Sequence, residues 1–213
     1  DESTIKRINK NCSILKIMNL EKLDSLNGLQ FENLPKSLQH MFLTRPIRVT
    51  VLNDRSDFSL RFDLFERLNT GGVTLHPQEI RNCLYLGAFN EFIKKCSENP
   101  DFKNVIKMTK KAERTGSLEE LALKFFAYFE NQDKFVHSVK DFLNEYMANK
   151  TISFRNRDQL EKLFNRTFEV LNDLLPEGIV RGNRKNITPI VLYEAIAVGV
   201  AALLTTETAI PRQ

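Results

Sequence analysis

The sequence has no tryptophan and only three cysteines among its 213 residues. Cys12, Cys83 and Cys96 are odd in number and show no C-x-x-C spacing. A disulfide framework needs paired cysteines, and most structural zinc sites need closely spaced ones, so the pattern argues against both. We therefore expect a reducing, cytoplasmic location and no metal site.

Long apolar runs are missing as well. The longest run, AIAVGVAALL at residues 195–204, has about half of the roughly 20 residues that a membrane-spanning helix needs. The opening stretch DESTIKRINKN contains no apolar signal region. We expect no membrane partner and no secretion signal. The helix that carries residues 195–204 is apolar nearly all round, so it is predicted to lie at the centre of a helical bundle.

Self-contained catalytic motifs are also absent. The sequence contains no G-x-x-x-x-G-K-[ST] phosphate loop, no G-x-G-x-x-G fingerprint, no G-x-S-x-G elbow and no H-E-x-x-H helix. His40, His76 and His137 have no second ligand-type residue at a spacing typical of metal sites. The chain alone is therefore predicted to have no nuclease or nucleotidase turnover.

The composition is that of a folded globular protein. Hydrophobic residues make up 42% of the chain and charged residues 27%, which is ordinary for soluble domains. Sixteen phenylalanines indicate a core built from large apolar side chains. The net charge of +4, from 31 basic and 27 acidic residues, permits an anionic partner without requiring one.

The apolar pattern changes along the chain. Residues 12–18 (CSILKIM) and 47–53 (IRVTVLN) have strand-like lengths and compositions, and residues 34–44 between them are typical of a short helix that Pro35 begins. Two strands alone are marginal in water, so we expect further strands before Asp1. From Phe58 onward the period is about 3.6 residues. The prediction is an α+β fold, mostly α, with a mixed α/β region at residues 1–75 and a helical domain at residues 76–213.

Local signals predict where helices begin and end. Gly71 and Gly72 end one helix, and Pro77 begins the next. Ser117 and Glu120 form an S-x-x-E capping box before another helix. The helix that begins at Pro77 is expected to be long, because apolar residues recur at every fourth position: Ile80, Leu84, Ala88, Phe92 and Cys96.

The junction FERLNTGGVTLHPQEIRN, residues 65–82, has two interpretations. Its glycines, its helix-start amides and its arginines would favour a bound phosphate or carboxylate. Alternatively, the glycines end a helix, Glu79 caps the next one and the arginines face solvent. Gln78, Arg81 and Asn82 share one helix side, so they either bind a ligand together or fix the junction as a side-chain network. The candidate nucleotide- or phosphate-binding residues are Asn69, Gly71, Gly72, Glu79, Arg81 and Asn82.

Two basic clusters, within residues 103–114 and 181–185, suit contacts to nucleic-acid phosphates. They equally suit a solvated surface, because no aromatic residue is interleaved with them for base stacking. The candidate nucleic-acid-binding residues are Lys103, Lys107, Lys110, Lys111, Arg114, Arg181, Arg184 and Lys185.

The stretch LFERLNTGGVTLHPQEIRNCLY, residues 64–85, resembles the helix junction of the ParB/sulfiredoxin-like domain of GmrSD-type restriction proteins, a large family long catalogued as a domain of unknown function. The order of the surrounding segments agrees, and the resemblance covers nearly the whole chain. The Asp-Gly-Gln-Gln-Arg signature of the family is missing from the sequence, and we expect it upstream of Asp1. The family pattern is met by Phe65, Asn69, Gly72, Leu75, Glu79, Ile80, Arg81 and Asn82.

The resemblance implies that the chain is part of a phage-defence restriction system. For the intact protein it implies nucleotide-dependent DNA cleavage or its control, with a nucleoside triphosphate and Mg as cofactors and with DNA and a nuclease domain or subunit as partners. Residues 69–82 would form part of a pocket wall, with Arg81 or its neighbours facing the ligand, so Arg81→Ala should leave thermal stability nearly unchanged. The alternative is a non-enzymatic helical interaction module that binds a partner protein or nucleic acid.

Overall fold

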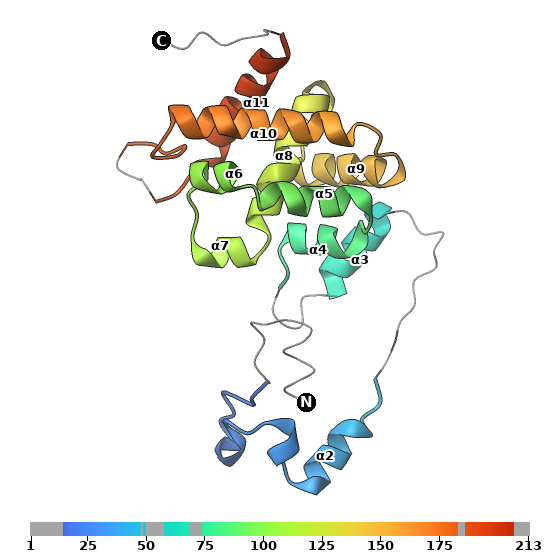
Figure 1. The fold of residues 1–213 in the computed structure, drawn as a ribbon. Coiled ribbons are helices and arrows are strands. Elements are labelled where there is room, and N and C mark those ends of the chain that lie inside the picture. The colour runs from blue at the N-terminus through green and yellow to red at the C-terminus, as the bar shows by residue number, and fades with distance from the viewer. Residues whose placement is uncertain (1–14, 48, 50–57, 69–73, 183–185, 207–213) are drawn as a thin grey trace. The chain divides into compact units, whose positions relative to one another are not determined.

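A computed structural model describes residues 15–47, 49, 58–68, 74–182 and 186–206 (Figure 1). The chain divides into two compact units, Asp1–Val51 and Leu52–Gln213. Helices hold 69% of the described residues and strands 2%, and these residues contain no sheet. The predicted α+β fold with a ParB-like mixed α/β region is therefore wrong, because the described part of the chain is helical.

The first unit contains short helices joined by loops. The 3-10 helices η1 and η2 span Asp24–Leu26 and Phe31–Asn33, and helix α2 spans Lys36–Leu43. Helix α2 follows Pro35 and confirms the short helix expected there. None of the described residues of this unit is buried.

The two predicted strands fail for a physical reason. Around residues 15–18 the only pairing is an isolated bridge between Lys16 and Gln30, and Ile47 and Val49 belong to no strand. Ile47 is 85% exposed and Val49 is 75% exposed. An alternating apolar pattern makes a strand only where neighbouring strands pair with it and bury one face. Residues 12–14, 48 and 50–53 of the predicted strands lie outside the described residues.

The second unit is a helical bundle. Its helices, in chain order, are α3 (Phe58–Leu68), α4 (Pro77–Leu84), α5 (Ala88–Ser97), α6 (Pro100–Val105), α7 (Lys110–Arg114), α8 (Ser117–Asn131), the 3-10 helix η4 (Gln132–Lys134), α9 (Val139–Ile152), α10 (Arg157–Leu174) and α11 (Ile190–Thr206). None of the described helices, including α11, is long and apolar enough to cross a membrane.

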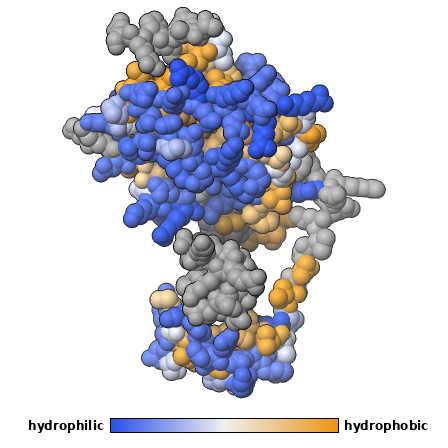
Figure 2. All heavy atoms as spheres, viewed as in Figure 1, coloured by the Kyte–Doolittle hydropathy of each residue, from blue (hydrophilic) through white to orange (hydrophobic). Residues whose placement is uncertain are grey.

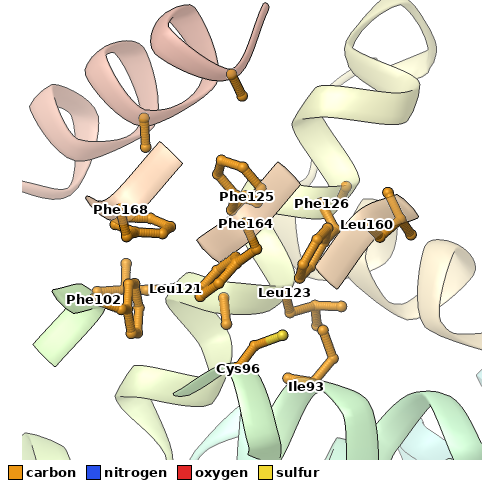
Figure 3. Packing of buried hydrophobic residues seen from close by; sticks show 14 of the residues in the cluster. Ile93, Cys96, Phe102, Leu121, Leu123, Phe125, Phe126, Leu160, Phe164 and Phe168 are labelled. Atoms are coloured by element: carbon orange, nitrogen blue, oxygen red, sulfur yellow. The ribbon is translucent and has the colours of Figure 1, made fainter. Parts of the chain in front are cut away.

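The core of this unit forms around α8, whose residues 121–127 are all buried. Aromatic side chains from α6, α8 and α10 meet there (Figure 3), where the ring of Phe164 lies 5.3 Å from that of Phe102. The rings of Phe102 and Phe168 are 4.8 Å apart, and those of Phe125 and Phe164 are 5.3 Å apart, in edge-to-face arrangements. The expected phenylalanine-rich core is confirmed for this unit.

The helix predicted to run from Pro77 past Cys96 is interrupted. It forms two helices, α4 and α5, because Gly87 between them has a φ of +138°. Residues with a side chain rarely adopt this backbone conformation. The fourfold spacing of apolar residues continues across the break, so periodicity alone could not locate it.

Helix α11 is not central. Only Tyr193, Ala197 and Ala201 on its inner side are buried, whereas Val191 is 78% exposed and Leu203 is 50% exposed. Figure 2 shows hydrophobic surface at the end of the unit where α11 lies. An all-round apolar helix is usually buried on every side, and here α8 takes the central position instead.

Candidate ligand-binding cavity

Helix α4 begins at Pro77, and Glu79 fixes its first turn. The Oε2 atom of Glu79 accepts a hydrogen bond of 2.8 Å from the backbone N–H of His76. A carboxylate at this position satisfies an otherwise unpaired N–H and lies favourably at the positive end of the helix dipole. The predicted capping role of Glu79 is therefore confirmed. Asn69, Gly71 and Gly72 lie outside the described residues.

Arg81 points inward from α4. It is only 1% exposed. Its Nε donates to Oδ1 of Asn144 on α9 at 2.8 Å, and its Nη1 donates at 3.1 Å to Oε1 of Gln78 and to Oε2 of Glu120 on α8. Burial lowers the pKa of Arg81, and the Glu120 carboxylate partly opposes that shift. The guanidinium is thus a buried cation with three side-chain hydrogen bonds.

This placement corrects two expectations. Arg81 faces no solvent and does not line the cavity described below, and the expectation that it is a surface residue, on which the predicted small effect of Arg81→Ala on stability rested, is wrong. Its partners Glu120 and Asn144 are 39 and 63 positions away along the chain, so helix spacing could not reveal them. Within α4 the spacing did succeed, because Nε2 of Gln78 also donates to Oδ1 of Asn82 at 3.1 Å.

Glu120 has a different role from the predicted one. The S-x-x-E capping-box prediction is wrong, because the residue before α8 is Gly116 with a φ of 75° and no side chain caps this helix. Instead Glu120 pairs with Arg81, and its Oε1 lies 3.9 Å from Nζ of Lys124. Lys124 pairs in turn with Glu194 of α11 at 3.1 Å. Cations and anions therefore alternate from α4 through α8 to α11.

A cavity of about 410 Å³ lies against this network. The volume is in the range of small-molecule sites. The cavity is formed by the start of α4, the linker between α6 and α7, helix α7 and the starts of α8 and α11. Its lining consists of His76, Pro77, Gln78, Ile106, Lys107, Met108, Thr109, Ala112, Thr115, Ser117, Glu120, Leu121, Ile187, Thr188 and Ile190.

Backbone pairing fixes two segments of the lining. The backbone N–H of Thr188 donates to the carbonyl of Lys107 at 2.7 Å, and the backbone N–H of Lys107 donates to Oγ1 of Thr188 at 2.8 Å. Nearby, the N–H of Ile179 donates to the carbonyl of Val105 at 2.9 Å. A Cβ at Gly178 would lie 2.6 Å from that carbonyl oxygen, so only glycine permits this close approach. The α6–α7 linker is thus held against the segment that leads to α11.

The basic residues of the first cluster fall into two groups. Lys107 lines the cavity, and Lys110, Lys111 and Arg114 are exposed on α7, the short helix that contributes Ala112 to the lining. Lys103 lies on α6 and pairs with Glu98.

In the second cluster Arg181 is exposed, and Arg184 and Lys185 lie outside the described residues. The structure therefore brings Lys107 of the first cluster to the same cavity as residues 76–78 of the junction, whereas Glu79, Arg81 and Asn82 do not line it.

Sequence reasoning missed Glu120 and Thr188 as cavity residues. Glu120 was interpreted only as part of a capping box, from its spacing after Ser117. The signal that could have found Glu120 is its place near a helix start, because the starts of α4, α8 and α11 all line this cavity.

Two features of the described residues bear on the chemistry that they could support. These residues contain no group of three or more His, Cys, Asp or Glu side chains that could hold a metal ion. Cys96 is buried in the core, where desolvation raises the pKa of its thiol to about 12, so a thiolate is disfavoured there. No family model, curated protein or solved structure matches the chain.

Proposed function

We propose that the second unit binds the nucleotide that controls DNA cleavage in a GmrSD-type restriction protein, and that the cavity of about 410 Å³ is the binding site. One observation carries this proposal. Residues 76–78 of the junction and Lys107 of the basic cluster line the same cavity, although sequence patterns suggested an anion for the junction as a whole and for the basic cluster separately.

The lining suits the two parts of a nucleotide. Ile106, Leu121 and Ile190 offer apolar contacts to a flat base. Lys107 and the exposed cations of α7 offer positive charge to phosphates. The starts of α4, α8 and α11 at the cavity add partly positive backbone N–H groups. A nucleotide thus finds apolar and cationic groups in one place.

The family resemblance also implies Mg with the nucleotide. Among the described residues that line the cavity, only Glu120 carries a carboxylate, and that carboxylate already pairs with Arg81. Mg requires several oxygen ligands in octahedral geometry. These residues do not fit a metal ion held by the protein, and the proposal contains no metal step.

Isothermal titration calorimetry of the 213-residue chain with ATP, GTP, CTP and UTP tests this proposal. We expect saturable binding of at least one of them, and a loss of roughly 10-fold or more in affinity for Lys107→Gln, since one charge-assisted contact is removed. Lys103→Gln is the matched control, because it removes the same charge from a residue that pairs with Glu98 outside the cavity.

The proposal is wrong if no nucleotide binds, or if both lysine substitutions weaken binding equally. A complex with a partner protein or nucleic acid that forms equally with and without nucleotide, and equally in Lys107→Gln, would favour the interaction-module alternative.

A further inference from the structure

Glu120 has an exceptional position in the cavity wall. Among the described lining residues it alone is acidic, and its side chain is 30% exposed. It projects from the first turns of α8, beside the apolar Leu121. A carboxylate that lines a cavity and remains accessible can accept hydrogen bonds from a ligand.

One oxygen of Glu120 is already used and the other has spare capacity. Oε2 accepts from Nη1 of Arg81 at 3.1 Å. Oε1 lies 3.9 Å from Nζ of Lys124, which exceeds hydrogen-bonding distance, and Lys124 approaches Glu194 to 3.1 Å instead. Each carboxylate oxygen accepts up to two hydrogen bonds. Glu120 therefore retains acceptor positions on both oxygens.

The two buried cations determine what kind of donor fits. Arg81 lies 3.1 Å from one oxygen of Glu120 and Lys124 lies 3.9 Å from the other, so two cations stand beside this carboxylate and balance its negative charge. A cationic ligand group would be repelled by these neighbours, whereas a neutral N–H group would gain a charge-assisted hydrogen bond without that penalty.

Three threonine hydroxyls of the lining are engaged in local hydrogen bonds. Oγ1 of Thr109 accepts from the backbone N–H of Ala112 at 3.3 Å, and Oγ1 of Thr188 accepts from the backbone N–H of Lys107 at 2.8 Å. The hydroxyl of Thr115 donates to the carbonyl of Ala112 at 3.0 Å. Glu120 is thus the strongest acceptor that the described lining offers to a ligand.

We propose that Glu120 selects guanine nucleotides by accepting the two adjacent N–H donors of the guanine base. This inference rests on the proposed function, because it assigns a base to the nucleotide of the same cavity. Guanine carries adjacent N1–H and N2–H groups that match the two oxygens of a carboxylate. Adenine, cytosine and uracil each place an acceptor beside their donor, so none of them presents two parallel N–H groups to Glu120.

Titration of the unaltered chain with GTP, ITP and ATP tests the inference without any change to the fold. ITP lacks the N2 amino group, and ATP lacks both the N1 hydrogen and the N2 amino group. We expect ITP to bind roughly 10-fold more weakly than GTP, and ATP roughly 100-fold more weakly, at one charge-assisted hydrogen bond per step. Equal affinities for the three nucleotides would overturn the guanine assignment and leave the proposed function standing. Absence of binding by all of them would overturn both.

Two matched substitutions locate the effect. Glu120→Gln keeps the shape of the side chain but replaces one acceptor with a donor, so the GTP-to-ITP affinity ratio should fall from roughly 10 to near one. Glu194→Gln removes the other carboxylate of the same charge network, which does not line the cavity, and should keep the ratio. An unchanged ratio in folded Glu120→Gln would overturn the role of Glu120. If that variant does not fold, the nucleotide series on the unaltered chain decides the question.

Discussion

The inner wall of the cavity and its basic rim use charge in opposite ways. We define the inner wall as Gln78, Arg81 and Glu120, and the basic rim as Lys107, Lys110, Lys111 and Arg114. Arg81 of the wall is 1% exposed and hydrogen-bonds to three side chains, whereas the three rim residues on α7 are exposed. A buried charge depends on its partners, while an exposed one is stabilised by water.

The comparison shows that a basic residue near a cavity is not necessarily a ligand contact. Arg81 and Lys107 were both candidates on sequence grounds, yet Arg81 of the inner wall is buried, whereas Lys107 of the basic rim lines the cavity. Stability and binding should therefore separate between wall and rim. Substitution of the buried Arg81 should act on folding, and substitutions in the basic rim should act on ligands.

Removal of Arg81 should have the largest effect on stability. Arg81→Ala leaves Glu120, Gln78 and Asn144 without their donor, and loss of one partner of a buried pair typically costs about 3 to 5 kcal/mol in the free energy of unfolding. Urea denaturation followed by circular dichroism measures this value. Arg114→Ala is the matched control on the rim and should stay within about 0.5 kcal/mol. If both substitutions lowered the free energy of unfolding equally, the inner wall and the basic rim would not differ in their contribution to stability.

Alkaline pH should destabilise the interior by a smaller amount. Burial raises the pKa of the Cys96 thiol from 9.0 to about 12, so between these values the folded state holds a proton that the unfolded state has lost. The free energy of unfolding should then fall by up to about 1.4 kcal/mol per pH unit for this group. Burial also raises the pKa of Tyr146 above its usual value of 10.0, which adds to the decline above pH 10.

Thermal unfolding between pH 8 and 10 checks the thiol. Cys96→Ala should flatten the decline just above pH 9.0, before the tyrosines contribute. Cys83→Ala, at an exposed thiol on α4, should leave the slope unchanged. If stability declines with pH equally steeply in both variants, the buried thiol of Cys96 does not cause the decline.

Substitutions in the basic rim should change stability least and the binding of polyanions most. Binding of DNA remains a prediction, and it should be weak, independent of sequence and sensitive to salt. Replacement of Lys110 and Lys111 by Gln should reduce the slope of log affinity against log salt by about two, because each phosphate contact contributes about 0.9. Fluorescence anisotropy with labelled DNA measures the slope. An unchanged slope would place any DNA contact on another surface.

Local sequence patterns predicted the helical part of the fold better than the site. Glu79 as a cap, and Gln78, Arg81 and Asn82 on one helix side, follow from spacings within one or two turns. The break at Gly87 and the burial of Arg81 depend on backbone conformation and on partners distant in sequence. The expected strands failed because strand formation depends on pairing that a single segment does not contain.

Glu120 is a second residue whose role its neighbours in the sequence did not predict. Its position three residues after Ser117 is typical of a capping box, but Arg81 offers this carboxylate a buried cation at 3.1 Å. A charge-assisted hydrogen bond to a buried cation outweighs a cap that solvent can also satisfy. Sequence indicated the residue, and only the tertiary contact indicated its role.

The central claim, that a nucleotide occupies this cavity, is tested most directly by NMR of the chain with labelled isoleucine and methionine methyl groups. On addition of GTP, the methyl signals of Ile106, Met108 and Ile190 should shift and saturate together, because these residues line the cavity. The signals of Ile93 and Met147, which are buried in the core away from it, should stay in place. Saturable shifts confined to residues outside the cavity, or no shifts at all, would contradict the claim.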